Sequence, residues 1–358
     1  MALQSNGIIF LDDNKNFSAQ GNTVLANDAS ILIANNDSVS GDGYAIIDEK
    51  SIADDGFDFN QFNSEEFSIS FLEGYKFQGT VSGYTSGGSP GEVTIDKFPF
   101  ASDGNATGVG DLTRATYGLA GSSSEESGYT SAGQSPSVFD IIDKFPFSTD
   151  ANATDVGDLT IGRFSPAGQS SEESGYVSGG DVPGYSNVID KFPFSTDANA
   201  TDVGDLSQAR PASGGQSSDV SGYTSGGGNV LATIDKFPFA SDANATDVGD
   251  LTVARSNTPA GQSSEESGYA SGGFGPSFSN VIDKFPFASD GNATDVGNLT
   301  QARYYAAGQS SDTSGYTSGG TTPPHANTID KFPFASDGFA ADVGNLAQAR
   351  SAAAGQQV

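Results

Sequence analysis

The side chains with the greatest chemical potential in this sequence are carboxylates: the chain has 45 Asp and Glu residues, one histidine, His325, and no cysteine. Disulfides, cysteine-ligated metals and sites that need two imidazoles are therefore excluded. A Ser-His-Asp arrangement finds no support, because the many serines recur at fixed repeat positions. A pair of carboxylates acting as acid and base stays open, although none of them differs from its repeat equivalents. We therefore expect a protein that is not an enzyme.

One acidic turn has the residue types of a metal site. Residues 242–247 place the side-chain oxygens of Asp242, Asn244 and Asp247 in one short turn, as a Ca²⁺ loop requires. The turn lacks the distal glutamate of an EF-hand, and Asn and Asp in such turns ordinarily bond to their own backbone. We favour the turn interpretation, keep these three residues as weak Ca²⁺ candidates, and expect no other cofactor.

The elements that position these residues repeat along the chain. The pentapeptide Asp-Lys-Phe-Pro-Phe occurs six times, beginning at Asp96, Asp143, Asp190, Asp235, Asp283 and Asp330, in steps of 47, 47, 45, 48 and 47 residues. A unit of about 40–50 residues that is rich in strand formers and Gly-bounded turns is typical of propellers and related arrays. Apolar content is only 35%, but the same aromatic and aliphatic positions recur in each unit, as a stacked core requires.

Each unit from about residue 79 contains four predicted strands. In the third unit they are 175–178, with a Gly pair after it, 187–194, and 203–206, followed by a Gly-Gln strand at 215–218. The first Tyr strand, at Tyr84, lacks a Gly-Gln strand before it, whereas the chain ends on such a strand at 354–358. We therefore predict six four-stranded blades, with the C-terminal strand completing the first blade and removing free edges. As an alternative, residues 75–80 supply that strand and the tail is loose.

The order of Leu-x-x-Ala-Arg, a small-residue strand, Tyr-x-x-Gly-Gly, an aromatic strand and an Asn/Thr turn resembles the kelch repeat, which implies propeller blades. The resemblance covers about 280 of the 358 residues. Kelch units normally carry a Trp after the Asn/Thr turn, and this chain has Val156, Val203, Val248 and Val296 there instead. We expect the paired phenylalanines, such as Phe192 and Phe194, to fill the space between blades. The pentapeptide itself resembles repeats in structural proteins of marine tailed bacteriophages, cyanophage-like ones in particular.

The basic residues after Lys76 recur with the repeat. Six lysines lie in the pentapeptide, and the arginines are Arg114, Arg163, Arg210, Arg255, Arg303 and Arg350. A binding site would concentrate charge in a few blades, so we interpret these residues as structural ion-pair partners of repeat carboxylates. The alternative is a sixfold cationic ring that holds an anion in the channel.

The repeats differ mainly in two loops, one after the Gly pair and one after the Arg. In an up-and-down blade both loops lie on the same face of the disc, and variable loops on a rigid scaffold are where recognition is usually built. They carry aromatic residues that are absent from the consensus, together with the single histidine. The predicted binding residues are Phe139, Phe164, Tyr185, Phe274, Phe278, Tyr304, Tyr305 and His325. The alternative is that several of these rings simply cover blade edges.

Residues 1–78 do not share the repeat. Short apolar runs at 7–11, 30–34 and 67–72 predict a small β-rich domain, which contains 13 carboxylates and only three lysines. It is predicted to dock or oligomerise, and residues 79–358 form the propeller. The formal net charge of −30 argues against nucleic acid or anionic membrane as a partner. The first residues lack the basic start and apolar core of a signal peptide, so we expect no cleaved leader.

These observations favour an all-β, non-enzymatic virion structural protein, a tail fibre, appendage or host-contact module. Residues 1–78 would contact other virion proteins, oligomerisation within the particle is expected, and the loops would contact a host-surface glycan or protein. The alternative is a cell-surface or secreted carbohydrate-binding propeller, and a hydrolase that uses propeller carboxylates is a third possibility.

Overall fold

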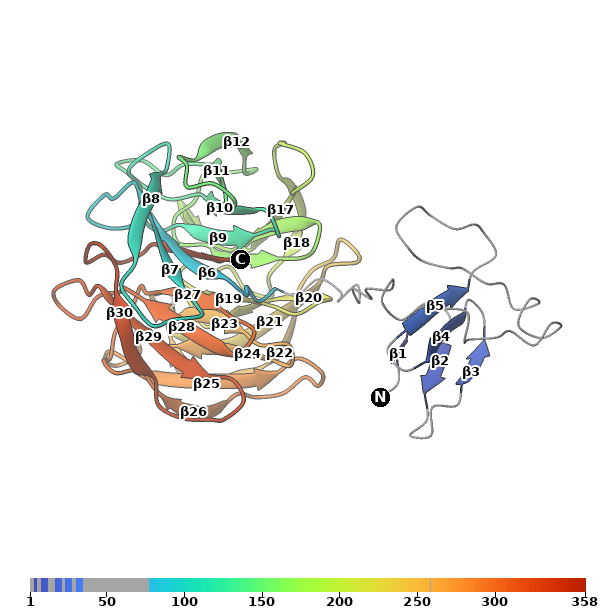
Figure 1. Cartoon of the computed structure of the whole chain (residues 1–358). Helices are drawn as coiled ribbons and strands as arrows, with labels where there is room; N and C mark the ends of the chain where they lie inside the picture. The colour runs from blue at the N-terminus through green and yellow to red at the C-terminus, as the bar shows by residue number, and fades with distance from the viewer. Residues whose placement is uncertain are drawn as a thin grey trace. The chain divides into compact units, whose positions relative to one another are not determined.

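All of the described elements are β-strands. The computed structural model describes residues 77–257 and 259–358, together with five strands between residues 3 and 34. These residues include no helix that is long and apolar enough to cross a membrane. The chain divides into two compact units, Met1–Gly74 and Tyr75–Val358 (Figure 1).

The first unit contains a three-stranded antiparallel sheet and a hairpin. The sheet consists of β1 (Leu3–Gln4), β2 (Ile8–Leu11) and β3 (Phe17–Gln20), and the hairpin of β4 (Thr23–Asn27) and β5 (Ser30–Ala34). Strands β2 and β5 match two of the predicted apolar runs. The third run, at 67–72, lies outside the described residues.

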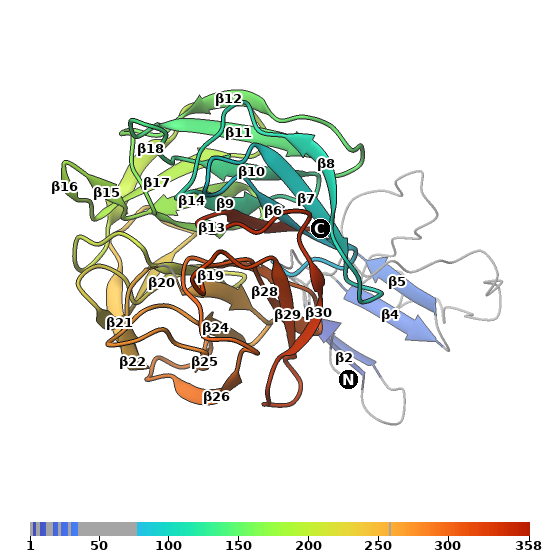
Figure 2. The ribbon, with the colours of Figure 1, turned by 90° about the vertical axis from the view of Figure 1, so that its left-hand side faces the viewer.

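The second unit is a six-bladed β-propeller, as the sequence predicted, and its blades follow one another around a ring (Figure 2). Each blade is a four-stranded antiparallel sheet, and its strands are named below in order from the axis outward. Blades 1 to 3 are β31 (Ala354–Gln357), β6 (Ser82–Ser86), β7 (Thr94–Pro99), β8 (Thr107–Asp111); β9 (Ala120–Ser123), β10 (Ser127–Ser131), β11 (Ile141–Pro146), β12 (Thr154–Asp158); and β13 (Ala167–Ser170), β14 (Ser174–Ser178), β17 (Val188–Pro193), β18 (Thr201–Asp205). Blades 4 to 6 are β19 (Gly214–Ser217), β20 (Ser221–Ser225), β21 (Leu231–Pro238), β22 (Thr246–Arg255); β23 (Ala260–Ser263), β24 (Ser267–Ser271), β25 (Val281–Pro286), β26 (Thr294–Asn298); and β27 (Ala307–Ser310), β28 (Ser314–Ser318), β29 (Thr328–Pro333), β30 (Ala341–Asn345). A small hairpin, β15 (Asp181–Val182) with β16 (Gly184–Tyr185), extends one loop of blade 3.

The C-terminal strand closes the ring. Strand β31 pairs with β6 in an antiparallel register that places Gln356 opposite Tyr84. This confirms the predicted clasp, and the alternative that residues 75–80 supply the strand is wrong. Gly79 instead pairs with Ser311 of blade 6, and the Phe77 carbonyl accepts a hydrogen bond of 3.0 Å from Gln357 Nε2. The segment before β6 therefore crosses the end of the inner strands.

Aromatic side chains fill the space between blades. The Tyr176 ring packs against Phe237 and Phe239 of the next blade, with centroids 5.5 and 4.8 Å away. The same three-ring contact recurs at all six boundaries. Val203 and its equivalents, at the position of the missing Trp, pack at the edge of these clusters. The expectation that the paired phenylalanines provide the filling is confirmed.

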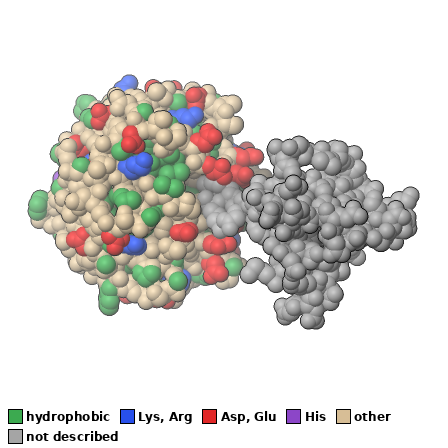
Figure 3. All heavy atoms as spheres, in the orientation of Figure 1, with side chains coloured by type: hydrophobic (Ala, Val, Ile, Leu, Met, Phe, Trp, Pro, Cys, Tyr) green, Lys and Arg blue, Asp and Glu red, His purple; other side chains and the backbone are tan. Residues whose placement is uncertain are grey.

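The pentapeptide lysines tie each blade to the next. Lys191 Nζ lies 5.8 Å from the centre of the Tyr176 ring and 3.4 Å from Asp242 Oδ1 of blade 4. All six lysines repeat this contact, with Nζ–Oδ1 distances of 3.0–3.4 Å. Acidic and basic side chains are accordingly interspersed over the propeller surface seen in Figure 3. Exposed pairs of this kind contribute little individually, so their main effect is to fix the blade-to-blade geometry.

Five arginines form buried ion pairs across the same boundaries. Arg210 Nη2 lies 3.0 Å from Asp235 Oδ2, and both side chains are fully buried. Asp235 also accepts hydrogen bonds from the backbone and side chain of Ser207. The equivalent pairs are Arg163–Asp190, Arg255–Asp283, Arg303–Asp330 and Arg350–Asp96. Eleven of the twelve repeat cations thus have the structural role that the sequence predicted.

Arg114 is the exception, and its assignment to the same repeat position is wrong. The buried arginines lie four residues after a buried leucine, as Arg163 does after Leu159, whereas Arg114 lies only two residues after Leu112. Thr116 occupies the buried position instead, and the exposed Arg114 guanidinium stacks over the Phe139 ring at 5.0 Å. Asp143 is buried, with 3% of its surface exposed. Because Arg114 lies elsewhere, Asp143 forms no ion pair with the described residues. Its described partner is Thr113, through the backbone N–H and the hydroxyl.

We predict that replacing two equivalent carboxylates by amides has very different effects on stability, large for Asp235 and small for Asp143. Asp235→Asn leaves the buried Arg210 guanidinium without its counter-charge and should cost about 3–5 kcal/mol of unfolding free energy. Asp143→Asn removes a buried charge that forms no ion pair with the described residues, and the amide can still accept from Thr113, so it should change stability by less than about 1 kcal/mol. Urea denaturation followed by circular dichroism measures both. Equal losses in the two variants would contradict the assignment.

The difference in stability between the wild-type chain and Asp143→Asn is predicted to depend on pH. Burial raises the pKa of the Asp143 carboxyl above its ordinary value of 3.8, and the hydrogen bonds from Thr113 oppose the rise. A carboxyl with a higher pKa in the folded state binds its proton more tightly there. The wild-type chain should therefore gain stability relative to Asp143→Asn as the pH falls from 7 toward 3.8. A difference between the two proteins that does not change with pH would show that the Asp143 pKa is not shifted.

Candidate functional site

The two variable loops of each blade lie on one face of the propeller, which we call the loop face. Across blade boundaries the loop after the Arg position pairs with the loop after the Gly pair. Examples are the bridges Phe164–Asp181, Ser256–Phe274 and Tyr304–Thr321. The prediction that both loops share a face is confirmed. Because backbone bridges join each of these loops to its neighbour, the loops support one another.

A ring of backbone surrounds the axis on this face. One residue in each link between blades has a positive φ, between 51° and 71°: Gly118, Ser165, Ala212, Asn257, Tyr305 and Ala352. Five backbone hydrogen bonds of 2.7–2.9 Å join neighbours in this ring, such as the Ala212 N–H to the Ser165 carbonyl. Five of the six residues carry side chains, which disfavour this conformation, so the ring contacts must hold it. The sequence did not predict this ring, because its members share no residue type.

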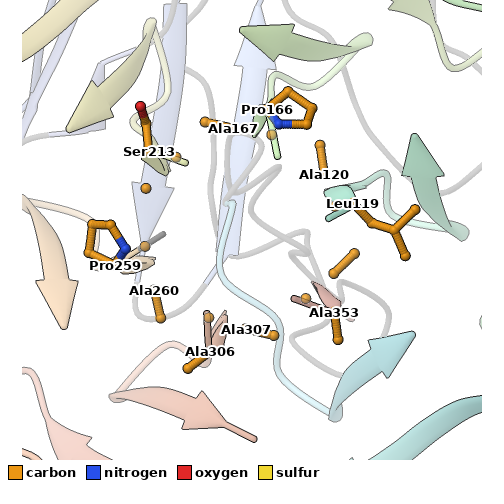
Figure 4. A pocket seen from close by; sticks show the side chains of 18 residues that line it. Leu119, Ala120, Pro166, Ala167, Ser213, Pro259, Ala260, Ala306, Ala307 and Ala353 are labelled. Atoms are coloured by element: carbon orange, nitrogen blue, oxygen red, sulfur yellow. The ribbon is translucent and has the colours of Figure 1, made fainter. Parts of the chain in front are cut away.

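A hollow of about 60 Å³ lies at the axis, beside this ring. Its walls are small and uncharged side chains from all six inner strands, including Leu119, Pro166, Ser213, Pro259 and Ala306 (Figure 4). The hollow has room for a few water molecules. It has no titratable side chain in its lining, so it can neither transfer protons nor hold an ion by charge. The predicted alternative of a cationic ring in the channel does not fit, because the repeat cations are paired elsewhere.

The largest group of predicted binding residues meets at the boundary of blades 5 and 6. The Phe278 ring lies 5.1 Å from the Tyr304 ring and 5.7 Å from the Phe274 ring, and Phe274 and Tyr304 are 6.0 Å apart. Tyr305 contacts Tyr304 at 5.2 Å. Phe278 is 39% exposed and the other three rings are half-buried. We call Phe274, Phe278, Tyr304 and Tyr305 the aromatic cluster.

Polar groups border the aromatic cluster. The backbone of Tyr304 pairs with Thr321, whose hydroxyl lies 3.2 Å from His325 Nδ1. The Tyr305 hydroxyl donates to Asn257 Oδ1 at 3.3 Å. Burial raises the pKa of Tyr305, and the charges of Tyr304 and Asp181 add to the rise, so this phenol stays protonated and able to donate. His325 is thus brought beside the cluster, whereas Asn257 and Thr321 were not predicted from the sequence.

The other predicted aromatics have separate environments. The Phe139 ring lies under Arg114, and Phe164 packs edge-on against Tyr117 at 5.5 Å and against the backbone of Gly118. These two rings are half-buried and cover blade edges. Tyr185 is 45% exposed and lies on β16, directly opposite Asp181 of β15. Their assignment to a binding site stays a prediction.

The weak Ca²⁺ candidates each have a different protein partner. Asp242 bonds to Lys191, Asn244 Oδ1 accepts from the backbone of Asp205 at 3.1 Å, and Asp247 Oδ1 accepts from the N–H of Gly249 at 3.2 Å. Within the described part of the chain no group of three or more His, Asp or Glu side chains is arranged to hold a metal ion. The turn uses its oxygens to join blades 3 and 4.

No protein-family model matches the sequence, and no curated protein is similar to it. The six-bladed architecture therefore rests on the repeats and the structure alone.

Chelation should leave the propeller unchanged. Because Asp242, Asn244 and Asp247 are bound to protein groups, adding about 5 mM EDTA should not lower the thermal midpoint, and adding Ca²⁺ should not raise it. Differential scanning calorimetry of the full chain measures both. A midpoint that rises with Ca²⁺ concentration, and returns to its starting value in Asp242→Asn, would show that the turn binds the ion.

Proposed function

We propose that this chain is a non-enzymatic structural protein of a tailed-phage virion. In this proposal the propeller is a tail fibre, appendage or host-contact module, and residues 1–78 dock to other virion proteins. The loop face contacts a glycan or protein of the host surface. Neither nucleic acid nor a membrane is a partner, in keeping with the formal charge of −30.

One observation carries the proposal: the repeated chemistry maintains the scaffold, and the repeats differ mainly in the loops of the loop face. Lysines and arginines of the repeat bind carboxylates of the next blade, and the repeated Tyr and Phe rings fill the boundaries. An enzyme would be expected to place distinctive titratable groups in a cleft, and the axial hollow has none in its lining. A rigid scaffold with variable loops suits recognition.

The route of the chain into the propeller is compatible with display. The Gly79 N–H donates to the Ser310 carbonyl at 2.9 Å, and the Val81 N–H to the Val358 carbonyl at 2.6 Å. Ser310 and Val358 lie at the ends of inner strands whose starting residues line the axial hollow on the loop face. The chain therefore enters the propeller on the face opposite the loop face. The loop face is therefore not the face through which the chain enters the propeller.

The proposal of a kelch-like phage protein comes from two short sequence patterns. The Tyr-x-x-Gly-Gly strand and its neighbours resemble kelch repeats, and the Asp-Lys-Phe-Pro-Phe pentapeptide resembles repeats of marine phage structural proteins. The same face would also serve a cell-surface or secreted carbohydrate-binding propeller, which is the alternative. The two functions differ in where the protein is found.

Immunogold electron microscopy tests the proposal. Antibodies raised against the full chain should label purified phage particles at the tail or its appendages. Serum that has been absorbed with the full chain is the control and should give no label. Recovery of the protein only from the bacterial envelope or medium, with unlabelled particles, would contradict the virion role and favour the alternative.

A further inference from the structure

One sector of the loop face combines loops without charged side chains with a cluster of aromatic rings. It consists of loops 272–280, 304–306 and 319–327 at the boundary of blades 5 and 6, and we call it the neutral sector. These loops contain no Asp, Glu, Lys or Arg, in a chain whose formal charge is −30. The corresponding loops of blades 1, 2 and 3 carry Glu92, Asp140 and Asp181, and loop 226–232 of blade 4 is uncharged but has no aromatic residue.

The outer strands show the same change. Strands β8, β12 and β18 end in Asp111, Asp158 and Asp205, whereas β26 and β30 end in Asn298 and Asn345. Two adjacent outer strands thus lack the terminal carboxylate beside loops that carry no charge. The loops of this sector bring no carboxylate of their own to a ligand, and Asp181 of blade 3 is the acidic side chain whose charge acts on Tyr305.

The aromatic cluster lies within this sector, and backbone hydrogen bonds hold its loops together. Ser256 and Phe274 exchange backbone hydrogen bonds of 2.7 and 2.9 Å, and the Ser279 N–H donates to the Gly273 carbonyl at 2.9 Å. Tyr304 and Thr321 exchange two more across the blade boundary, at 2.8 and 3.3 Å. The rings of Phe274, Phe278 and Tyr304 are therefore held in position before any ligand arrives, which lowers the entropy cost of binding.

We infer that the neutral sector binds an uncharged polysaccharide. The apolar C–H face of a sugar ring would stack on Phe278 and Tyr304, and its hydroxyls would bond to the polar groups beside them, Thr321 and His325. An anionic glycan is disfavoured, because the cations of the described propeller, apart from Arg114 in blade 2, are paired with carboxylates. A protein partner would need roughly 800 Å² on this face, and the surrounding loops bear Glu92, Asp140 and Asp181.

This inference rests on the proposed role of the loop face in recognition, and affinity electrophoresis of the full chain tests it. The probes are native gels that contain β-glucan, galactomannan or arabinoxylan, compared with gels that contain alginate or dextran sulfate. At least one neutral polysaccharide should retard the protein and both anionic ones should not. Phe278→Ala and Tyr304→Ala should weaken that retardation by about tenfold.

Phe339→Ala is the matched control, because it removes a 76% exposed aromatic ring from the turn between β29 and β30, outside the predicted binding residues. It should change the affinity by less than about twofold, and all three variants should keep the wild-type thermal midpoint. Retardation by no neutral probe, retardation by anionic probes only, or an equal loss in Phe339→Ala would overturn the inference. Labelled particles without neutral-glycan binding would refute only this inference, whereas binding without labelled particles would refute only the virion role.

Discussion

The propeller depends on the contact of backbone with backbone at its axis. Each inner strand has a glycine at its second position, and a Cβ atom added there would lie only 2.0–2.2 Å from the glycine carbonyl oxygen of the adjacent inner strand. The six residues are Gly121, Gly168, Gly215, Gly261, Gly308 and Gly355. No other residue type permits this approach. The glycine contact therefore sets the inner radius, and Tyr and Phe rings fill the boundaries as the blades diverge outward.

Ion pairs between neighbouring blades support this geometry. The chain is strongly acidic, yet the repeat lysines and five arginines bind carboxylates of the following blade, so that each boundary combines an exposed pair with, in five of six cases, a buried one. Remaining carboxylates give the surface its charge and favour solubility. The boundary of blades 1 and 2 lacks the buried pair because Thr116 replaces the arginine, with Leu119 packed beside it against Gly133. Variation is thus tolerated where neighbouring packing compensates for it.

The repeat made the architecture predictable, whereas the candidate site required coordinates. A near-constant step, with Tyr84 lacking an inner strand and 354–358 lacking a partner, was enough to predict six blades and the clasp. Arg114 was misassigned because residue type was compared without its offset from Leu112. The positive φ of Ala212 or Tyr305 has no signal in residue type, since the ring of hydrogen bonds imposes it. Contact between Phe278 and Tyr304 joins two loops across a blade boundary, which spacing along the chain does not encode.

A comparison of two glycine-to-alanine variants tests the axial contact most directly. Gly215→Ala would bring a methyl group to 2.1 Å from the Gly168 oxygen, whereas a Cβ at Gly291 has no atom within 4 Å. The account predicts that Gly215→Ala loses more than about 4 kcal/mol of unfolding free energy or fails to fold, and that Gly291→Ala stays within about 0.5 kcal/mol of wild type. Two variants of equal stability in urea denaturation would contradict it.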